Sequence, residues 1–256
     1  MNDLEGKCFV LFGAGGLIGQ ILLQNLLDAG ALVCAADNSQ VALDRLAEKY
    51  IGNTQVFVEY VDIADAGLLA ALFLSVKARV GRVDGAINTS YPRNPNYGRH
   101  FFDVTYEDFG ENLQLHLGGY FMVLQQAAKF ALDQDSKFSL VQFSSIYGVI
   151  PPKFSIYAGT QMTTPVEYAA IKSALLHLTS YATAYTKGSK FRVNCISPGG
   201  ILDRQPESFL ENYRAQCQSK GMLDPGDIVG SVLFLCSDQS QYVCGQNIVV
   251  DDGFTV

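Results

Sequence analysis

Short apolar runs alternate with longer amphipathic segments along the whole chain. Each run spans four to seven residues, which is too short for a buried helix and typical of strands covered on both faces. The runs are residues 7–12, 31–36, 55–61, 83–88, 138–143, 191–196 and 247–250. Helical periodicity fills the intervals at residues 18–29, 39–50, 65–79, 106–133, 166–187 and 225–237. The alternation predicts an α/β protein with a doubly wound parallel sheet.

Three polar segments follow strands of this predicted sheet, at residues 89–105, 149–166 and 200–222. Ligands of open α/β sheets bind at the carboxyl ends of the strands, so we expect these segments to form the substrate site. The stretch from 203 to 221 is polar and is expected to be mobile. No linker interrupts the pattern, which predicts a single domain over residues 1–256.

Composition narrows the class of partners. The 256 residues carry 18 basic and 25 acidic side chains, a net charge of −7 without a basic cluster, so nucleic acid and anionic membranes are poor partners. No apolar stretch reaches the roughly 18 residues of a membrane span, and no signal-like start is present, which predicts a cytoplasmic protein. The six cysteines lack a C-x-x-C pair. We expect buried thiols and neither a metal site nor a disulfide.

Glycines separate the first predicted strand from the first predicted helix. They lie in the stretch Gly13-Ala14-Gly15-Gly16-Leu17-Ile18-Gly19. A strand, a glycine turn and a helix form the context of a phosphate-binding loop, because glycine lets the backbone approach a pyrophosphate and a helix N-terminus favours an anion.

Polar residues end the next strands at the same edge. Asp37, after the second strand, could accept hydrogen bonds from an adenosine ribose and would repel a 2′-phosphate, which favours NAD over NADP. Alternatively, residues 37–39 could serve only as the N-cap of the following helix, with no role in cofactor binding. Asp62, with Ile63 beside it, and Asn88 could also touch a cofactor, or could serve only in turns.

The candidate catalytic pair is Tyr168 and Lys172, one helical turn apart on the same face. An ammonium next to a phenol lowers its pKa from about 10, so the tyrosine could exchange a proton with an alcohol or carbonyl. Ser144 and Ser145 end the strand before this helix, where a hydroxyl can hold a substrate oxygen. Tyrosine and lysine at this spacing also recur on solvated helix faces, so the pair alone does not establish catalysis.

Taken together, the motifs resemble the short-chain dehydrogenase/reductase family over essentially the whole chain. They are the glycine loop, Asp37, Asn88, the serine pair, Tyr-x-x-x-Lys, Arg192-Val-Asn-x-Ile-x-Pro-Gly and the terminal Gly245-Gln246 and Asp252-Gly253. The resemblance implies a Rossmann fold, a nicotinamide cofactor and assembly into homodimers or homotetramers.

The same resemblance implies roles for single residues. Ser145 would polarise the substrate oxygen, Tyr168 would be the acid/base, and Lys172 would lower its pKa and bind the nicotinamide ribose. The implied cofactor contacts are Gly13, Gly16, Leu17, Ile18, Gly19, Asp37, Asp62, Ile63, Asn88, Lys172, Pro198, Gly199, Gly200 and Ile201.

Three departures from the family pattern stand out. The Asn-Asn-Ala-Gly motif reads Asn88-Thr89-Ser90-Tyr91, and His116 stands where the family carries a relay asparagine. Imidazole could relay protons or contact substrate, or the change could serve packing. The serine-to-tyrosine spacing is 23, against about 13 in the family. Tyr157 lies near the usual spacing, but Gln161 follows it where a lysine is needed, so residues 149–166 are interpreted as an insertion.

A narrower similarity concerns the substrate. His116, Tyr91 and the segment from Met162 to Tyr168 are similar to a subgroup associated with flagellin modification and sugar pathways, which implies a sugar phosphate or nucleotide sugar. Tyr91, Arg93 and Met162 are the candidate substrate contacts, and Arg93, Arg99 or His100 could meet an anionic group. Two alternatives stay open: a sugar epimerase or dehydratase that retains NAD, and a non-catalytic cofactor-binding sensor or scaffold.

Overall fold

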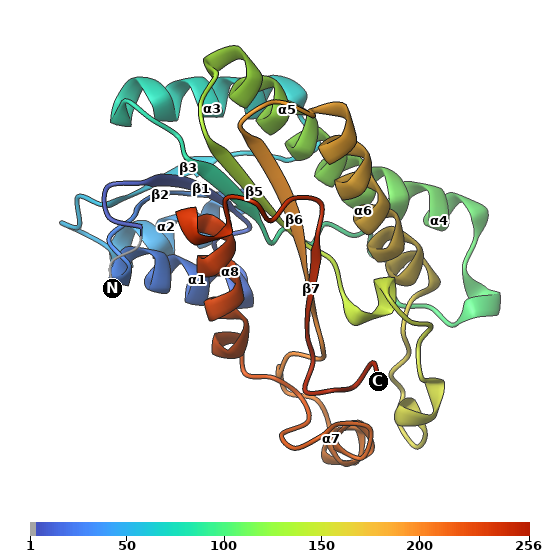
Figure 1. The fold of residues 1–256 in the computed structure, drawn as a ribbon. Helices are drawn as coiled ribbons and strands as arrows, with labels where there is room; N and C mark the ends of the chain where they lie inside the picture. The colour runs from blue at the N-terminus through green and yellow to red at the C-terminus, as the bar shows by residue number, and fades with distance from the viewer. Residues whose placement is uncertain (1–3) are drawn as a thin grey trace.

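Seven parallel strands form one sheet in the computed structural model, which describes residues 4–256 (Figure 1). The strand order is β3-β2-β1-β4-β5-β6-β7. The strands are β1 Cys8–Phe12, β2 Leu32–Asp37, β3 Val56–Tyr60, β4 Gly85–Asn88, β5 Phe138–Phe143, β6 Phe191–Pro198 and β7 Asn247–Val250. The order reverses between β1 and β4, where the outward crossovers of the two halves diverge and leave a ligand crevice. The predicted doubly wound parallel sheet is confirmed.

Helices cover both faces of the sheet. On one face lie α1 Leu17–Asp28, α2 Gln40–Lys49 and α8 Val229–Cys236, and on the other lie α3 Ala66–Val80, α5 Gly119–Gln134 and α6 Val166–Tyr185 (Figure 1). Each layer buries its own apolar cluster against the sheet, because the strands are apolar on both faces. Side-chain caps fix where helices begin: Ser39 accepts from the backbone of Ala42, and Asp65 from that of Leu68.

Two elements differ from the prediction. The helix expected over 106–133 is α4 Tyr106–Asn112 and α5 joined by a π-helical turn, Leu113–Gly118. The polar segment 203–221, in which no helix is predicted, holds a helix, α7 Glu207–Arg214. The buried residues of this helix are Phe209 and Tyr213, one turn apart, and Leu210 beside them is partly buried. The 149–166 segment contains one 3-10 turn, Phe154–Tyr157, which packs against α7.

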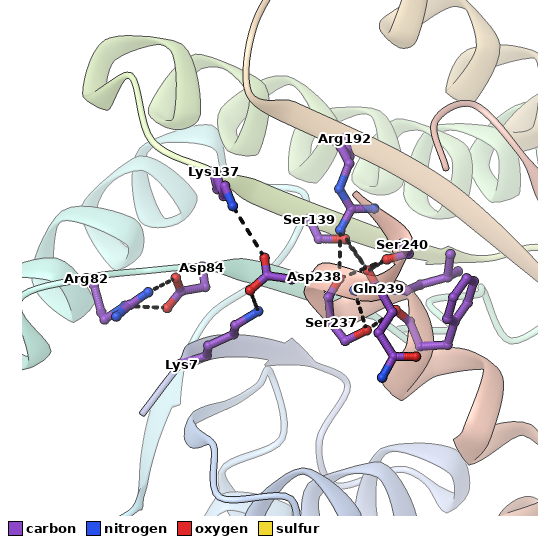
Figure 2. A network of polar contacts seen from close by, with 12 residues as sticks. Lys7, Arg82, Asp84, Lys137, Ser139, Arg192, Ser237, Asp238, Gln239 and Ser240 are labelled. Atoms are coloured by element: carbon purple, nitrogen blue, oxygen red, sulfur yellow. Dashed lines mark hydrogen bonds and ion pairs between the residues drawn. The ribbon is translucent and has the colours of Figure 1, made fainter. Parts of the chain in front are cut away.

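The amino edge of the sheet carries a basic hollow of about 900 Å³. Figure 2 shows the polar contacts of four of its lining residues, Lys7, Lys137, Arg192 and Asp238. Lys7 and Lys137 approach the Asp238 carboxylate at 3.0 and 3.7 Å. Arg192 donates to the carbonyl oxygens of Leu235 at 3.1 Å and Val243 at 3.2 Å. Helix C-termini point their carbonyls to this edge, and cations stabilise them there. The basic hollow therefore has a structural explanation.

Within residues 4–256 no helix is both long and apolar enough to cross a membrane. All six cysteines are free, and four of them are buried, as expected: Cys8, Cys34, Cys195 and Cys236.

Candidate active site

The glycine loop between β1 and α1 is shaped by close backbone approach. Gly13 adopts a left-handed φ of +74°, and a Cβ on Gly19 would lie 2.1 Å from the carbonyl oxygen of Gly13. Helix α1 begins after Gly16 without a side-chain cap. The first N–H groups of this helix, at Leu17, Ile18 and Gly19, are thus available to an anion, and all three residues line a cavity.

A first cavity of about 360 Å³ lies between the glycine loop and the end of β2. Asp37 lines it, and its carboxylate accepts from the backbone N–H groups of Gly15 at 2.9 Å and Ser39 at 3.0 Å. The helix cap is Ser39, so the Asp37 carboxylate is not needed as the N-cap of α2. Ile63 also lines the cavity, whereas the Asp62 carboxylate accepts from the Ala64 N–H at 2.9 Å within a turn.

A second cavity of about 660 Å³ holds the candidate catalytic residues. Ser145, Tyr168 and Lys172 line it together with residues 198–201 and Met162. Both cavities share the same central wall, formed by Gly16, Thr89, Ser90 and Tyr91. An extended dinucleotide can therefore reach from the Asp37 side to the Tyr168 side along one continuous surface.

Helix α6 aligns the tyrosine and lysine. The Lys172 ammonium donates to the Phe143 carbonyl at 2.8 Å and lies 5.5 Å from the centre of the Tyr168 ring. The two serines at the end of β5 have different partners. Ser144 donates to the Lys172 carbonyl at 2.7 Å and so ties the end of β5 to α6, whereas Ser145 interacts with the Tyr168 side chain.

Burial governs the charges of the pair. Burial raises the pKa of Tyr168, and the hydrogen bond with Ser145 opposes that increase. Burial also lowers the pKa of Lys172 to about 7. The sequence pattern predicts that Lys172 lowers the tyrosine pKa, but in this structure the loss of hydration outweighs any such effect, because Lys172 is buried and Tyr168 is only partly exposed.

His116 is fully buried in the π-helical turn. Its Nε2 lies 3.3 Å from the Lys172 Nζ, and its Nδ1 is buried without a hydrogen-bond partner. Burial, followed by the nearby Lys172 charge, lowers the pKa of His116. A neutral imidazole can accept a hydrogen bond from the ammonium, so the histidine belongs to the polar surroundings of Lys172. Single π-turns recur at functional sites.

Hydrogen bonds of Thr89 and Tyr120 stabilise the segment after β4, where the family motif is altered. The Thr89 hydroxyl donates to the Phe12 carbonyl at 2.8 Å, which joins β4 to the glycine loop. The Tyr120 hydroxyl donates to the carbonyls of Asn88 at 3.1 Å and Ser90 at 3.0 Å. Asn88 itself is buried and lines neither cavity, although Thr89 beside it lines both, so a contact of Asn88 with the cofactor stays a prediction.

The polar loop after β4 separates its charged residues. Arg93 lines the second cavity, with its guanidinium 4.8 Å from the centre of the Tyr91 ring. Arg99 instead pairs with Asp108 at 2.9 Å, which helps to hold the loop on α4. His100 lines neither cavity.

Several residues of the second cavity are missed by sequence reasoning. Tyr147, Phe209, Tyr213 and Met222 all line it. The Tyr213 hydroxyl accepts a hydrogen bond from the Gly200 N–H at 2.6 Å, which fixes α7 to the loop after β6. The one signal in the sequence is the pair of aromatic residues four positions apart in α7.

Tyr157, the tyrosine nearest the usual family spacing from Ser145, bonds to other side chains of the cavity wall. The Tyr157 hydroxyl contacts those of Thr164 and Tyr147, the latter at 3.3 Å, and its ring packs on Phe209 at 5.2 Å. Gln161, and not a lysine, stands four residues after Tyr157, which belongs to the wall of the second cavity.

Comparison with known proteins covers nearly the whole chain. A family model described as Enoyl-(Acyl carrier protein) reductase matches residues 13–255. Post-translational flagellin modification protein A of Campylobacter coli is 36% identical over 254 residues, 98% of this chain and 99% of the relative. A 7alpha-hydroxysteroid dehydrogenase of Bacteroides fragilis is 26% identical over 263 residues, 100% of this chain and 97% of the relative. The crystal structure of a short chain dehydrogenase from Leptospira borgpetersenii with bound NAD+ superimposes with a TM-score of 0.87 at 32% identity, covering 99% of this chain and 94% of that one.

Proposed function

The chain belongs to the short-chain dehydrogenase/reductase family, and from this membership we propose that it is an NAD-dependent oxidoreductase that interconverts an alcohol and a carbonyl on a small polar molecule. The observation that carries the proposal is the meeting of Ser145, Tyr168 and Lys172 in one cavity that continues to the glycine loop.

Each residue has a role in this proposal. Ser145 holds the substrate oxygen, and Tyr168 gives a proton to that oxygen or takes one from it. Lys172 binds the nicotinamide ribose and supplies positive charge beside the phenol, and His116 accepts a hydrogen bond from the ammonium. When bound, the nicotinamide supplies or accepts the hydride.

The residues present fit a dinucleotide. The uncapped start of α1 and the close approach at Gly19 leave a backbone cradle for a pyrophosphate. The Asp37 carboxylate at the first cavity supports a preference for NAD, since a 2′-phosphate would meet its negative charge. The NAD+ bound to the Leptospira relative supports the same preference.

The substrate in this proposal is a hydroxylated metabolite such as a sugar phosphate or nucleotide sugar used in flagellin or glycan modification. The similarity to the Campylobacter flagellin modification protein and the polar loops around the second cavity support this choice. A cytoplasmic location and a homodimer or homotetramer stay predictions, as do the substrate-site roles of residues 89–105, 149–166 and 200–222.

A comparison of Tyr168→Phe with the unchanged enzyme tests the function. We expect NAD-linked turnover of polyols, sugar phosphates or nucleotide sugars, and a loss of about 10²-fold or more in the variant, the usual contribution of an acid/base group. Tyr157→Phe should lose far less. NADH should bind both variants and the unchanged enzyme, more tightly than NADPH, as followed by cofactor fluorescence.

Other outcomes identify the alternatives. Product formation without net reduction of added NAD+ would indicate an epimerase or dehydratase that retains its cofactor. NADH binding without any turnover, unaffected by Tyr168→Phe, would indicate a sensor or scaffold. Equal binding of NADPH would remove the assigned role of Asp37.

A further inference from the structure

Arg93 is a cation without an ionic partner in the part of the chain that the structure describes. It lines the second cavity, and no carboxylate there lies within ion-pair distance of its guanidinium. Asp203 lines the same cavity without pairing with it. The nearby Arg99 is neutralised by Asp108 at 2.9 Å. Of the two arginines in this loop, only Arg93 has no carboxylate partner among the described residues, so its charge is available to a ligand.

Tyr91 holds this charge next to the reacting groups. The Arg93 guanidinium lies 4.8 Å from the centre of the Tyr91 ring, a cation–π distance. The same ring meets Tyr168 edge-on at 5.9 Å and His116 at 5.2 Å. The Tyr91 hydroxyl donates to that of Tyr97 at 3.0 Å, which restrains the ring. Arg93 thus stands one aromatic ring away from Tyr168.

The position separates Arg93 from the adenosine side of the cofactor surface. Tyr91 lines both cavities, but Arg93 lines only the second one, with Ser145 and Tyr168. A planar guanidinium binds phosphate or carboxylate oxygens through two parallel hydrogen bonds. The same cavity also holds the start of α1, where the pyrophosphate is proposed to bind, so the affinity for NADH distinguishes a substrate anion from the cofactor as the ligand of Arg93.

We propose that Arg93 binds an anionic group of the substrate, so that the enzyme selects phosphate esters or carboxylates over neutral polyols. The inference rests on the proposed oxidoreductase function, and it assigns specificity to a residue outside the Ser145, Tyr168 and Lys172 set. Phosphate and carboxylate share the chemistry that Arg93 recognises, so the experiment treats them in separate arms.

The experiment compares the unchanged enzyme with Arg93→Gln and Arg93→Lys on three sets of compounds: neutral polyols and sugars, their phosphate esters, and their aldonic acids. We expect Arg93→Gln to lower kcat/KM for one charged set by about 10- to 100-fold, mostly through KM, as for a lost hydrogen bond to a charged group. Turnover of neutral compounds and the affinity for NADH should not change. Arg93→Lys should restore part of the loss.

Arg99→Gln is the matched control, because it removes the same charge from the same loop. It should preserve the ratio of kcat/KM between charged and neutral compounds. An equal change of this ratio in Arg99→Gln and Arg93→Gln would overturn the inference, because general loop charge would then explain it. A preference for neutral compounds in the unchanged enzyme would overturn it as well.

Calorimetric binding of the same compounds to the enzyme–NADH complex separates this inference from the proposed function. Binding of charged compounds that is lost in Arg93→Gln, without NAD-linked turnover of any compound, would uphold the role of Arg93 and refute the oxidoreductase. NAD-linked turnover that is the same in Arg93→Gln would uphold the oxidoreductase function and refute the role of Arg93. Absence of both binding and turnover would overturn both.

Discussion

Lys172 combines a buried amine with polar partners that carry no negative charge. Its ammonium contacts the Phe143 carbonyl at 2.8 Å and His116 at 3.3 Å, and the rings of Tyr91, Tyr120 and Tyr168 surround it within 6 Å. Only 3% of its surface is exposed. The ammonium therefore depends on carbonyl and ring dipoles, which compensate lost hydration only in part.

This environment predicts a pH-dependent contribution of Lys172 to stability. Burial lowers its pKa from 10.5 to about 7. Below pH 7 the folded and unfolded chains both hold the proton, whereas between about 7 and 10.5 only the unfolded chain holds it. Folding therefore becomes more favourable as the pH rises through this window.

Urea unfolding of the unchanged protein and of Lys172→Met at several pH values measures the effect. Between pH about 7 and 8.5, before free cysteines ionise in the unfolded chain, the unchanged protein should gain up to about 1.4 kcal/mol per pH unit relative to the variant. Lys187→Met, at an exposed position just beyond α6, is the control for the loss of one lysine side chain. A flat difference for Lys172→Met would contradict the shifted pKa.

At the scale of elements, α7 connects three parts of the substrate side. Tyr213 accepts from the Gly200 N–H at 2.6 Å and stacks on the Phe254 ring at 4.5 Å. Phe209 packs on Tyr157 in the 149–166 segment at 5.2 Å. The helix thereby fixes the loop after β6, the C-terminal turn and the insertion to one another.

The anchor of α7 predicts a specific loss. Tyr213→Phe keeps the ring packing but leaves the Gly200 N–H without its acceptor, which should lower the free energy of unfolding by about 1–2 kcal/mol. The KM for the cofactor should also rise, since Gly200 belongs to the loop proposed to lie beside the nicotinamide. Tyr242→Phe, at a side chain that is 89% exposed, should change neither quantity. Equal stability of the two variants in urea would show that the hydrogen bond is dispensable.

The same elements show how far the sequence predicts the structure. The strands are predictable because each is a compact apolar run between polar turns, and the Tyr168 helix because its periodicity is regular. The π-turn at His116 leaves no mark in periodicity, since one extra residue in a helix barely shifts the apolar face. The sequence pattern does not predict helix α7, because the helix is stabilised by the packing of Phe209 and Tyr213 on distant segments. Local composition does not reveal such tertiary contacts.

For the site, spacing predicts which residues meet at the carboxyl edge but not how they are hydrated. Ser145, Tyr168 and Lys172 line one cavity, as the order of strands and helices predicts. Asn88 also ends a strand at this edge, yet it is buried and lines neither cavity, and the Tyr120 hydroxyl donates to its carbonyl oxygen. The direction of the Tyr168 pKa depends on burial, which a list of neighbours in sequence cannot provide.

Across the whole molecule, the two edges of the sheet have different tasks. The amino edge gathers cations such as Arg192 against helix C-termini, and the carboxyl edge holds the glycine loop and the second cavity. Charge at the first edge offsets the dipoles of the helices, whereas Arg93 at the second edge has no such counterpart in the described chain. The parallel fold thus concentrates structural charge at one edge and leaves the other for ligands.

The reactivity of the cysteine thiols tests how tightly the helices pack on the sheet. Four cysteines are buried in the two apolar layers, and burial raises the pKa of Cys8 and Cys236 to about 12 and that of Cys195 to about 11. Cys217 and Cys244 are partly exposed, but burial also raises the pKa of Cys217 to about 11. Cys244 is partly exposed, so an aromatic disulfide reagent should reach it first at pH 8. Cys217 should react slowly, because its raised pKa disfavours the thiolate, which is the reactive form.

The native protein should therefore release about one equivalent of reporter rapidly at pH 8, while the protein unfolded in urea should release six, one for each cysteine. The Cys244→Ser variant should lose the rapid phase and keep the slow ones. The buried thiols should react only when the sheet opens, at a rate that rises with urea in step with unfolding. Rapid release of four or more equivalents from the native protein would show that the apolar layers are open to solvent, in conflict with the packing of strands β1, β2 and β6 between their helices.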